Sequence, residues 1–254
     1  MKLKIMTQNV RCGNDPNGHS IKERTPRLLA QIQEWDPDLM GFQEATPEWE
    51  MRLEPLKERY GVIWMYRHPC DSREATPIYW KKDVFELVEE EHFWLSETPM
   101  AVSKGWNSDH FRVASRAGLR HKESGKILQL FNTHFDWVAP GPRESAQLII
   151  RKAEKLGDVP VFAIADFNFT PDSPPWHSMR SWFYDVREEI APENTQSTTC
   201  SYRPAGSPGG HIIDYCFYHG NGVKPTRYEV LTKEYDGKFV SDHFGVYFEF
   251  EVEE

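Results

Sequence analysis

The sequence predicts an α/β fold in which two packed, mixed β-sheets are flanked by helices. Strand-like segments outnumber segments with helical periodicity, and both hairpin-like and helix-linked pairs of strands occur along the chain. The 254 residues are 39% hydrophobic and 27% charged, an ordinary globular composition that excludes disordered, collagen-like and coiled-coil chains. No linker, repeat or low-complexity tract interrupts them, so we expect a single domain over residues 1–254.

Strands are expected where apolar residues run together or alternate with polar ones. The most regular alternation is in the last of these segments, where every second residue is Phe or Val. The predicted strands are residues 3–9, 38–44, 61–66, 127–134, 159–166, 211–217 and 244–252.

Three segments have apolar residues at helical spacing: residues 26–35, 49–60 and 142–156. In the first, Pro26 precedes the apolar stripe and is expected in the first turn, where proline is tolerated. In the second, Pro55 is expected to kink or shorten the helix.

The overall charge limits the class of partner. Acidic residues outnumber basic ones 39 to 30, which gives a formal net charge of −9. Because duplex DNA is bound mainly through Lys and Arg on its phosphates, a long duplex is not the expected partner. A small phosphorylated substrate held in a local basic pocket is compatible with this charge.

Targeting signals are absent from the sequence. No apolar run is long enough for a signal peptide or a membrane span, and the four cysteines form no CxxC pair. We therefore expect a soluble, reduced, cytoplasmic protein without a zinc knuckle, and secretion by another route stays open.

Polar side chains stand where six of the apolar runs begin or end. They are Asn9, Glu44, His134 with Asp136, Asp166 with Asn168, Asp214, and Asp242 with His243. A single such residue is more typical of a turn. Together they supply hard oxygen ligands and two imidazoles, which suits a Mg²⁺ or Mn²⁺ site acting on a phosphate.

The motifs TQNVR, GFQE, NTHFD, ADFN, IDY and SDH, in this order, resemble those of the endonuclease/exonuclease/phosphatase superfamily. This superfamily includes deoxyribonuclease I, exonuclease III, neutral sphingomyelinases, inositol polyphosphate 5-phosphatases and the deadenylases with nocturnin. The resemblance implies a four-layer α/β sandwich like that of deoxyribonuclease I. The aromatic loops at residues 93–99 and around Trp106 and His110 resemble a bacterial branch of unassigned substrate, nearer the deadenylase and nocturnin side.

The resemblance also implies a metal site. Glu44 resembles the principal metal carboxylate, and Asn9 resembles the amide that shares the metal or orients its water. Asp242 is expected to add a metal contact through water. Mg²⁺ and Mn²⁺ suit these ligands equally.

Five further residues resemble the catalytic groups of the superfamily. Asp166 resembles the residue that orients or deprotonates the attacking water, and Asn168 its neighbour that holds a phosphate oxygen. His243 resembles the histidine on the scissile phosphate, and Asp214 its carboxylate partner. His134 resembles a second phosphate-contacting histidine.

Substrate-binding residues are expected around these groups. Arg11, Arg112 and Arg143 are candidates for holding phosphate oxygens, since arginine suits bidentate phosphate contacts. Glu74 is placed like the family residue that supports the second histidine, with a solvated loop residue as the alternative. Trp94 is a candidate for stacking on a base or sugar, with packing inside the sandwich as the alternative.

The predicted function is metal-dependent hydrolysis of a small phosphodiester or phosphomonoester. The segment HIIDYCF lacks the tryptophan and Asp-Arg of inositol 5-phosphatases, which disfavours that branch. The alternative is a nuclease acting on short or single-stranded nucleic acid. A non-catalytic binding module is less favoured, because it is expected to lose at least one of Glu44, Asp166 and His243, and all are present. The oligomeric state has no signal in the sequence.

Overall fold

The computed structural model describes residues 1–70 and 73–253, and it contains two six-stranded sheets. The first sheet is ordered β11 (Val223–Leu231), β12 (Gly245–Val252), β1 (Lys2–Asn9), β2 (Leu39–Gln43), β4 (Ile78–Lys81) and β3 (Tyr60–Ile63). The second is ordered β5 (Phe85–Trp94), β6 (Val113–His121), β7 (Ile127–His134), β8 (Val161–Asp166), β10 (Asp214–His219) and β9 (Tyr184–Asp185). Both sheets are mixed, because β1–β2 and β7–β8 are parallel and the other pairs are antiparallel.

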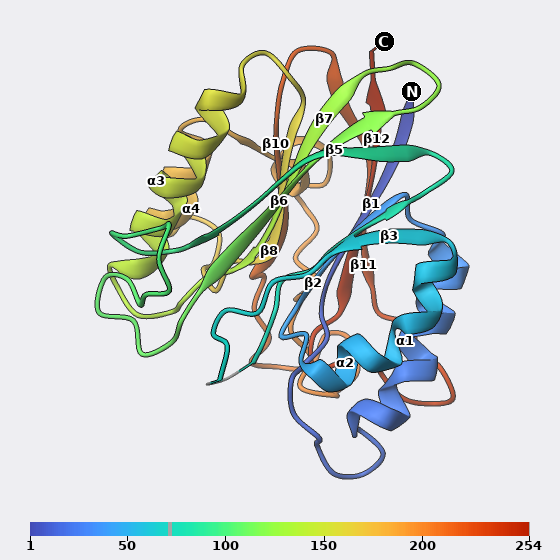
Figure 1. The fold of residues 1–254 in the computed structure, drawn as a ribbon. Coiled ribbons are helices and arrows are strands. Elements are labelled where there is room, and N and C mark those ends of the chain that lie inside the picture. The colour runs from blue at the N-terminus through green and yellow to red at the C-terminus, as the bar shows by residue number, and fades with distance from the viewer. Residues whose placement is uncertain (71–72, 254) are drawn as a thin grey trace.

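Helices cover the outer faces of both sheets (Figure 1). On the first sheet lie α1 (Ile21–Trp35), α2 (Pro47–Arg52) and the 3₁₀ turn η1 (Glu54–Glu58). On the second lie α3 (Gly141–Ala153), the 3₁₀ turn η2 (Glu154–Leu156) and α4 (Pro174–Arg180), and α5 (Val186–Ile190) contacts β10 and β11. This arrangement is the predicted α/β sandwich of deoxyribonuclease I type.

The main apolar core lies between the two sheets. It includes Ile5 and Phe248 from the first sheet and Leu130 and Ile164 from the second, all without solvent exposure. Burial of such side chains is the principal stabilising term for a sandwich. The alternating Phe and Val residues of β12 lie in this core as predicted, because successive side chains of a strand point to opposite faces.

A buried asparagine joins the sheets near the end where the candidate site lies. Asn132 on β7 donates to the carbonyl oxygens of Phe42 and Pro77, each at 2.8 Å, and accepts from Gln43 at 2.7 Å. Because buried polar groups must be hydrogen-bonded, these contacts hold the two sheets in one register.

Gly41 on β2 is required by this close approach of the sheets. A Cβ atom there would lie 2.6 Å from Asn132 Cγ and 2.7 Å from Ile164 Cδ1. We expect Gly41→Ala to lower the free energy of unfolding by about 1–3 kcal/mol, as overpacked core substitutions do, measured by urea unfolding. Gly141→Ala is the control, since its Cβ would meet nothing closer than 3.7 Å; equal effects of both variants would contradict the packing argument.

The structure corrects one helix prediction. Helix α1 begins at Ile21, because Ser20 and Glu23 form a capping box. Pro26 therefore lies in the second turn, not in the first as the sequence suggested. The expectation for Pro55 is confirmed, because α2 ends at Arg52 and the chain continues as a 3₁₀ turn.

Five strands were not predicted: β4, β5, β6, β9 and β11. Strands β5 and β11 are edge strands, where only one side of the backbone is paired and charged side chains are tolerated. Three consecutive glutamates interrupt the alternation in β5, and a proline beside a register shift interrupts β11. Trp94 consequently ends β5 rather than standing in a loop.

Candidate active site

The sheet topology brings the polar strand ends together at one end of the sandwich, the lower end in Figure 1. In the parallel pair β1–β2, Asn9 is paired with Gln43. Glu44 is the next residue after Gln43 and therefore lies beside Asn9. In the second sheet, Asp166 is level with His134 on β7 and with Asp214 on β10. Carboxyl ends of parallel strands meet at the same sheet edge, where functional groups of α/β folds gather.

Asn9 connects the two sheets at this end. Its side-chain amide donates to Glu44 Oε1 at 3.0 Å and to Asp166 Oδ2 at 2.9 Å, while its oxygen accepts from the backbone of Arg11 at 2.9 Å. One short side chain therefore fixes the relative position of the two carboxylates. Both Glu44 and Arg11 have left-handed backbone conformations, with φ of 59° and 60°. Such strain in non-glycine residues is typical of functional sites.

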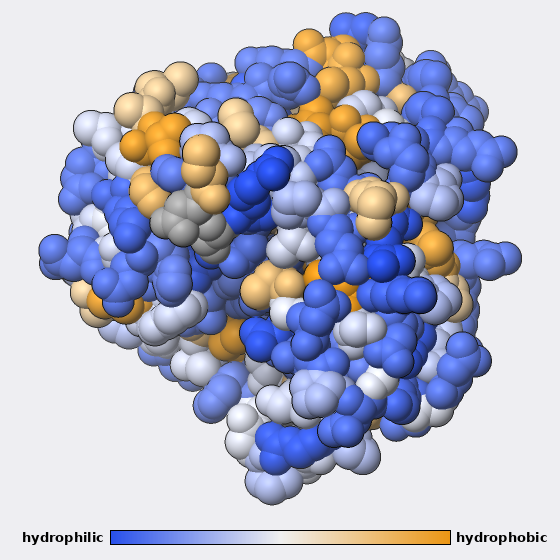
Figure 2. All heavy atoms as spheres, turned by 60° about the horizontal axis from the view of Figure 1, so that its bottom comes forward, coloured by the Kyte–Doolittle hydropathy of each residue, from blue (hydrophilic) through white to orange (hydrophobic). Residues whose placement is uncertain are grey.

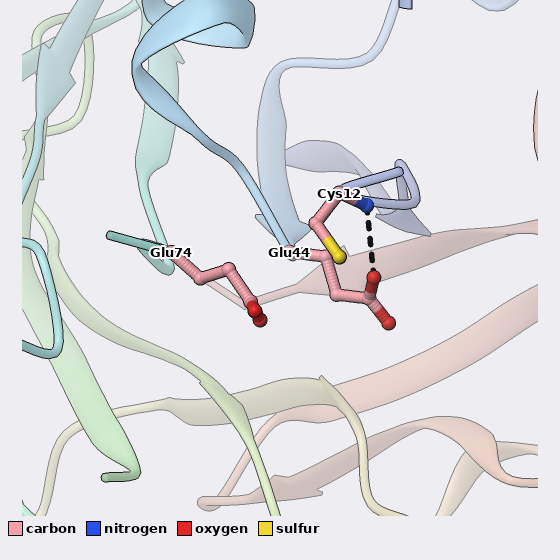
Figure 3. Close-up of side chains that lie close together, drawn as sticks. All are labelled: Cys12, Glu44 and Glu74. Atoms are coloured by element: carbon pink, nitrogen blue, oxygen red, sulfur yellow. Dashed lines mark hydrogen bonds between the residues drawn. The ribbon is translucent and has the colours of Figure 1, made fainter. Parts of the chain in front are cut away.

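Glu44 is held in its charged form. Burial opposes ionisation, but hydrogen bonds from Cys12 and Asn9 keep the pKa of Glu44 below its ordinary value. Cys12 donates its backbone N–H to Glu44 Oε2 at 2.8 Å, and the carboxylate of Glu74 points toward both residues (Figure 3). Their ligand atoms lie within 4.8 Å of one another, close enough to share one ion. The two carboxylates fit a hard divalent cation, whereas the third ligand atom of this group, the sulfur of Cys12, is a soft donor.

Asp166 is the centre of the second cluster. Its Oδ2 atom lies 3.4 Å from His134 Nε2 and 3.8 Å from His243 Nε2. Burial and the charge of Asp214 raise the pKa of Asp166, which makes it a stronger base than an ordinary carboxylate. A buried carboxylate with a raised pKa between two imidazoles is suited to accepting a proton.

The two histidines differ in charge. His243 Nδ1 lies 3.0 Å from Asp214 Oδ2. Although burial opposes the imidazolium, the charge and hydrogen bond of Asp214 raise the pKa of His243 to about 10. Burial, Arg112 and Arg67 lower the pKa of His134 well below its ordinary value. At neutral pH, His243 is therefore a cation and His134 a neutral imidazole.

Asn168 lies at the turn after β8. Its side-chain amide donates to the carbonyl of Phe135 at 2.8 Å, and its backbone N–H donates to Asp166 Oδ1 at 3.0 Å. Its φ of 51° is left-handed, a conformation that asparagine tolerates better than most residues. The turn thus orients Asp166 and places the Asn168 side chain beside it.

The predicted arginines occupy three different environments. Arg11 Nε lies 3.1 Å from Asp15 and 3.7 Å from Asp242, so Asp242 is ion-paired at the edge of the site. Arg112 is buried beside His134 in a shared cavity. Arg143 is exposed on α3, where it lines a separate apolar groove with Asn168.

Two predicted substrate contacts have other partners in the structure. Trp94 is only 9% exposed, and its indole N–H donates to the carbonyl of Arg67 at 2.8 Å, so the structure packs this ring inside the sandwich. Trp106 packs against the core beneath α3. Glu74 lines the cavity with His134 and accepts a hydrogen bond from Arg67 at 2.7 Å.

Two residues that the sequence did not reveal support the site. Thr198 donates its hydroxyl to Asp214 Oδ2 at 2.6 Å and accepts from two backbone N–H groups, those of Ile213 and Asp214. Arg67 contributes a second guanidinium beside Arg112. Thr198 does not stand at the end of an apolar run, so the pattern that identified the other residues did not apply to it. Arg67 directly follows the predicted strand over residues 61–66, and its position at that strand end is the signal that could have identified it.

A cavity of about 210 Å³ opens beside Glu44 and His134. Arg11, Cys12, Glu44, Arg67, Glu74, His110, Arg112, His134 and Trp137 line it. The surrounding face of the molecule is mostly hydrophilic, and its hydrophobic side chains form small separate groups (Figure 2). Mixed arginine, histidine and carboxylate walls of this size suit a compact phosphorylated group together with a cation.

The fold is that of a class of phosphoesterases and nucleases. The family model described as the Endonuclease/Exonuclease/phosphatase family matches residues 6–243, so the chain belongs to this family. This confirms the resemblance found in the sequence motifs.

Solved structures of similar proteins cover the whole fold. An endonuclease/exonuclease/phosphatase family protein from Bacteroides thetaiotaomicron superposes with a TM-score of 0.89 at 28% identity, covering 100% of this chain and 99% of that chain. A mannosyl-6-phosphatase from the same organism has a TM-score of 0.87 at 29% identity, and the match covers 98% of this chain and 99% of that chain. Carbon catabolite repressor protein 4 homolog 3 of Arabidopsis thaliana is 27% identical over 208 residues, which are 75% of this chain and 43% of that protein.

Proposed function

We propose that this protein is a divalent-metal-dependent phosphoesterase that hydrolyses a small phosphorylated molecule by in-line attack of water. The observation that supports it is the position of Asp166. This basic carboxylate is 2% exposed, shares Asn9 with the anionic Glu44, and lies against one neutral and one cationic histidine. Such an arrangement brings a base, a cation site and phosphate donors to one point.

Glu44 is the proposed anchor of the cation, supported by the Asn9 amide and, through water, by Asp242. The group that fits is Mg²⁺ or Mn²⁺, since Glu44 and Asp242 offer carboxylate oxygens. A bound divalent ion would polarise the phosphate and stabilise the charge on the leaving oxygen.

Among the described residues no helix is long and apolar enough to cross a membrane.

The chain's own residues supply the remaining chemistry. Asp166 orients a water molecule and takes its proton as the water oxygen bonds to phosphorus. The bond to the leaving oxygen breaks on the opposite side, and its electron pair stays with that oxygen. His243, which is a cation, offsets the negative charge that develops on the phosphoryl oxygens. His134 is neutral and donates an N–H to one of these oxygens. Asn168 is the proposed second donor to these oxygens.

A small substrate fits the remaining observations. The chain has a net charge of −9, the cavity is compact, and one structural relative is a mannosyl-6-phosphatase. Nuclease activity on short single strands is the second candidate, because Trp137 beside the cavity is 59% exposed and a base can stack on such a ring. A nuclease is expected to bind oligonucleotides with strong salt dependence, whereas the small-molecule enzyme is not.

The proposal is tested by hydrolysis of a phosphoester panel with Mg²⁺, Mn²⁺ or a chelator. The panel contains chromogenic mono- and diesters, sugar phosphates, nucleotides, oligonucleotides and sphingomyelin. We expect turnover that the chelator removes and Mg²⁺ or Mn²⁺ restores, with Glu44→Gln requiring far more metal for half-maximal activity. Metal-independent turnover, or an unchanged metal requirement in Glu44→Gln, would contradict the proposed site.

A further inference from the structure

Arg112 is a buried cation whose hydrogen-bond donors are not satisfied. Its side chain is 4% exposed, and its Nε and Nη1 atoms have no hydrogen-bond partner among residues 1–70 and 73–253. The nearest carboxylate oxygen, Asp136 Oδ2, lies 3.7 Å from Nε, beyond hydrogen-bond range. The guanidinium also lies 5.3 Å from the ring centroid of Trp137, a contact that supplies no hydrogen-bond acceptor. Because buried polar groups are almost always hydrogen-bonded, the two nitrogen atoms without an acceptor indicate that a ligand supplies one.

The neighbouring charged side chains do not supply the missing hydrogen-bond acceptor for Arg112. Asp136 is already bound by the hydroxyl of Ser108 and by the backbone N–H of Val138 at 2.8 Å. Arg67 forms its ion pair with Glu74. Burial and the charge of Arg67 also lower the pKa of Arg112, so the cation is destabilised until an anion binds.

The cavity narrows beside Arg112. Arg112, Glu44 and His134 line both the open cavity and a narrow extension of about 10 Å³. The buried residues Ala75, Thr76 and Val113 complete this extension. Such a volume has room for about one water-sized group. An oxygen atom fits there, but an ester substituent does not.

We propose that Arg112 receives an unesterified oxygen of the reacting phosphoryl group, so that the protein hydrolyses phosphomonoesters in preference to phosphodiesters. This inference rests on the proposed phosphoesterase function. A phosphate held at His134 and reaching toward Arg112 must present a free oxygen to this narrow end. In in-line attack three substituents of phosphorus surround the reaction axis, and His134, His243 and Arg112 are the proposed donors to them. In a monoester all three are unesterified oxygens, whereas a diester has only two and its second ester group must take one of these three positions.

The direct test compares two substrates that share one leaving group, 4-nitrophenyl phosphate and methyl 4-nitrophenyl phosphate. With Mg²⁺, we expect the wild-type protein to favour the monoester in kcat/KM by about 10²-fold or more, the usual effect of one well-placed donor. Equal rates, or preference for the methyl diester, would overturn the inference even though phosphoesterase activity itself is established.

Arg112→Met is the matching variant, with Arg120→Met as control. Arg120 lies on the same strand, is exposed and pairs only with Glu86 in the described structure. We expect Arg112→Met to lower the monoester kcat/KM by about 10²–10³-fold and the diester value by less than about tenfold. Equal losses of kcat/KM for the monoester and the diester would show that Arg112 does not bind the additional unesterified oxygen of the monoester.

Binding of inorganic phosphate supplies a readout that needs no turnover. In chelator-treated full-length protein, calorimetry should show phosphate binding about tenfold or more weaker in Arg112→Met than in wild type and Arg120→Met. Unchanged phosphate affinity would contradict the assignment. If no phosphoester is hydrolysed by wild type at all, the proposed function fails instead, and this binding experiment still decides whether Arg112 is an anion site.

Discussion

Asp166→Asn is expected to lower kcat by about 10²–10⁴-fold, the range that a general base contributes. Asparagine keeps the shape of the side chain and can still accept from the Asn9 amide, but it cannot take a proton from water. The folded protein should lose no stability, because burial makes the charged form of Asp166 unfavourable. Initial rates with the preferred substrate and a thermal melt measure the two effects.

The matched control is Asp185→Asn. Asp185 is likewise a buried aspartate with a pKa raised by burial, but it caps α5 and accepts from the indole of Trp176 at 2.9 Å. Its replacement should change stability and leave kcat unchanged. If both variants retained full activity, Asp166 would not be the base.

The second large effect is expected for Asp214→Asn. Asp214 raises the pKa of His243, and a charge-stabilising donor of this kind typically contributes about 10²–10³ in rate. The protonated histidine is the active form, so activity is present below its pKa and lost above it. Without the Asp214 charge this pKa falls, and the alkaline limb of kcat/KM should move from near pH 10 toward neutral pH.

The variant Thr198→Val tests the orientation of Asp214 separately from the effect of its charge on His243. It removes the hydroxyl that donates to Asp214 but keeps the carboxylate. We expect a smaller loss of kcat and little movement of the alkaline limb, because Asp214 still carries its charge. A shift of that limb as large as in Asp214→Asn would mean that Thr198 controls the charge state rather than the position of Asp214.

The acid limb of the same profile reports on Asp166. A base must be deprotonated, so activity should be lost as the pH falls through its pKa. Since burial and Asp214 raise that pKa, the loss should occur above the value of about 3.9 of an ordinary aspartate. A wild-type profile that stayed flat down to pH 4 would contradict this assignment.

Much of the fold and of the candidate site could be predicted because their signals are local. Continuous or alternating apolar residues identified interior strands such as β7, β8 and β12, and the polar residue at each strand end identified the candidate groups. Edge strands β5 and β11 were missed because one unpaired side and one solvent-facing surface relax the pattern.

Packing partners could not be predicted in the same way. Trp94 and Arg112 both stood in the sequence as possible substrate contacts. Only the structure shows that the indole of Trp94 donates to the carbonyl of Arg67, whereas Nε and Nη1 of Arg112 have no hydrogen-bond acceptor among the described residues. Whether a polar atom is satisfied depends on neighbours from distant segments, which carry no periodic signal in the chain.

The sequence by itself determined strands β1, β2, β7, β8, β10 and β12 and which oxygen and nitrogen atoms stand at their ends, because both depend on neighbours two to four residues away. Only the tertiary structure decided how those atoms meet. Asn9 binds Asp166 across 157 residues of sequence, and Asp214 sets the charge of His243. Charge and basicity depend on distance and burial, and these exist only once the two sheets have packed.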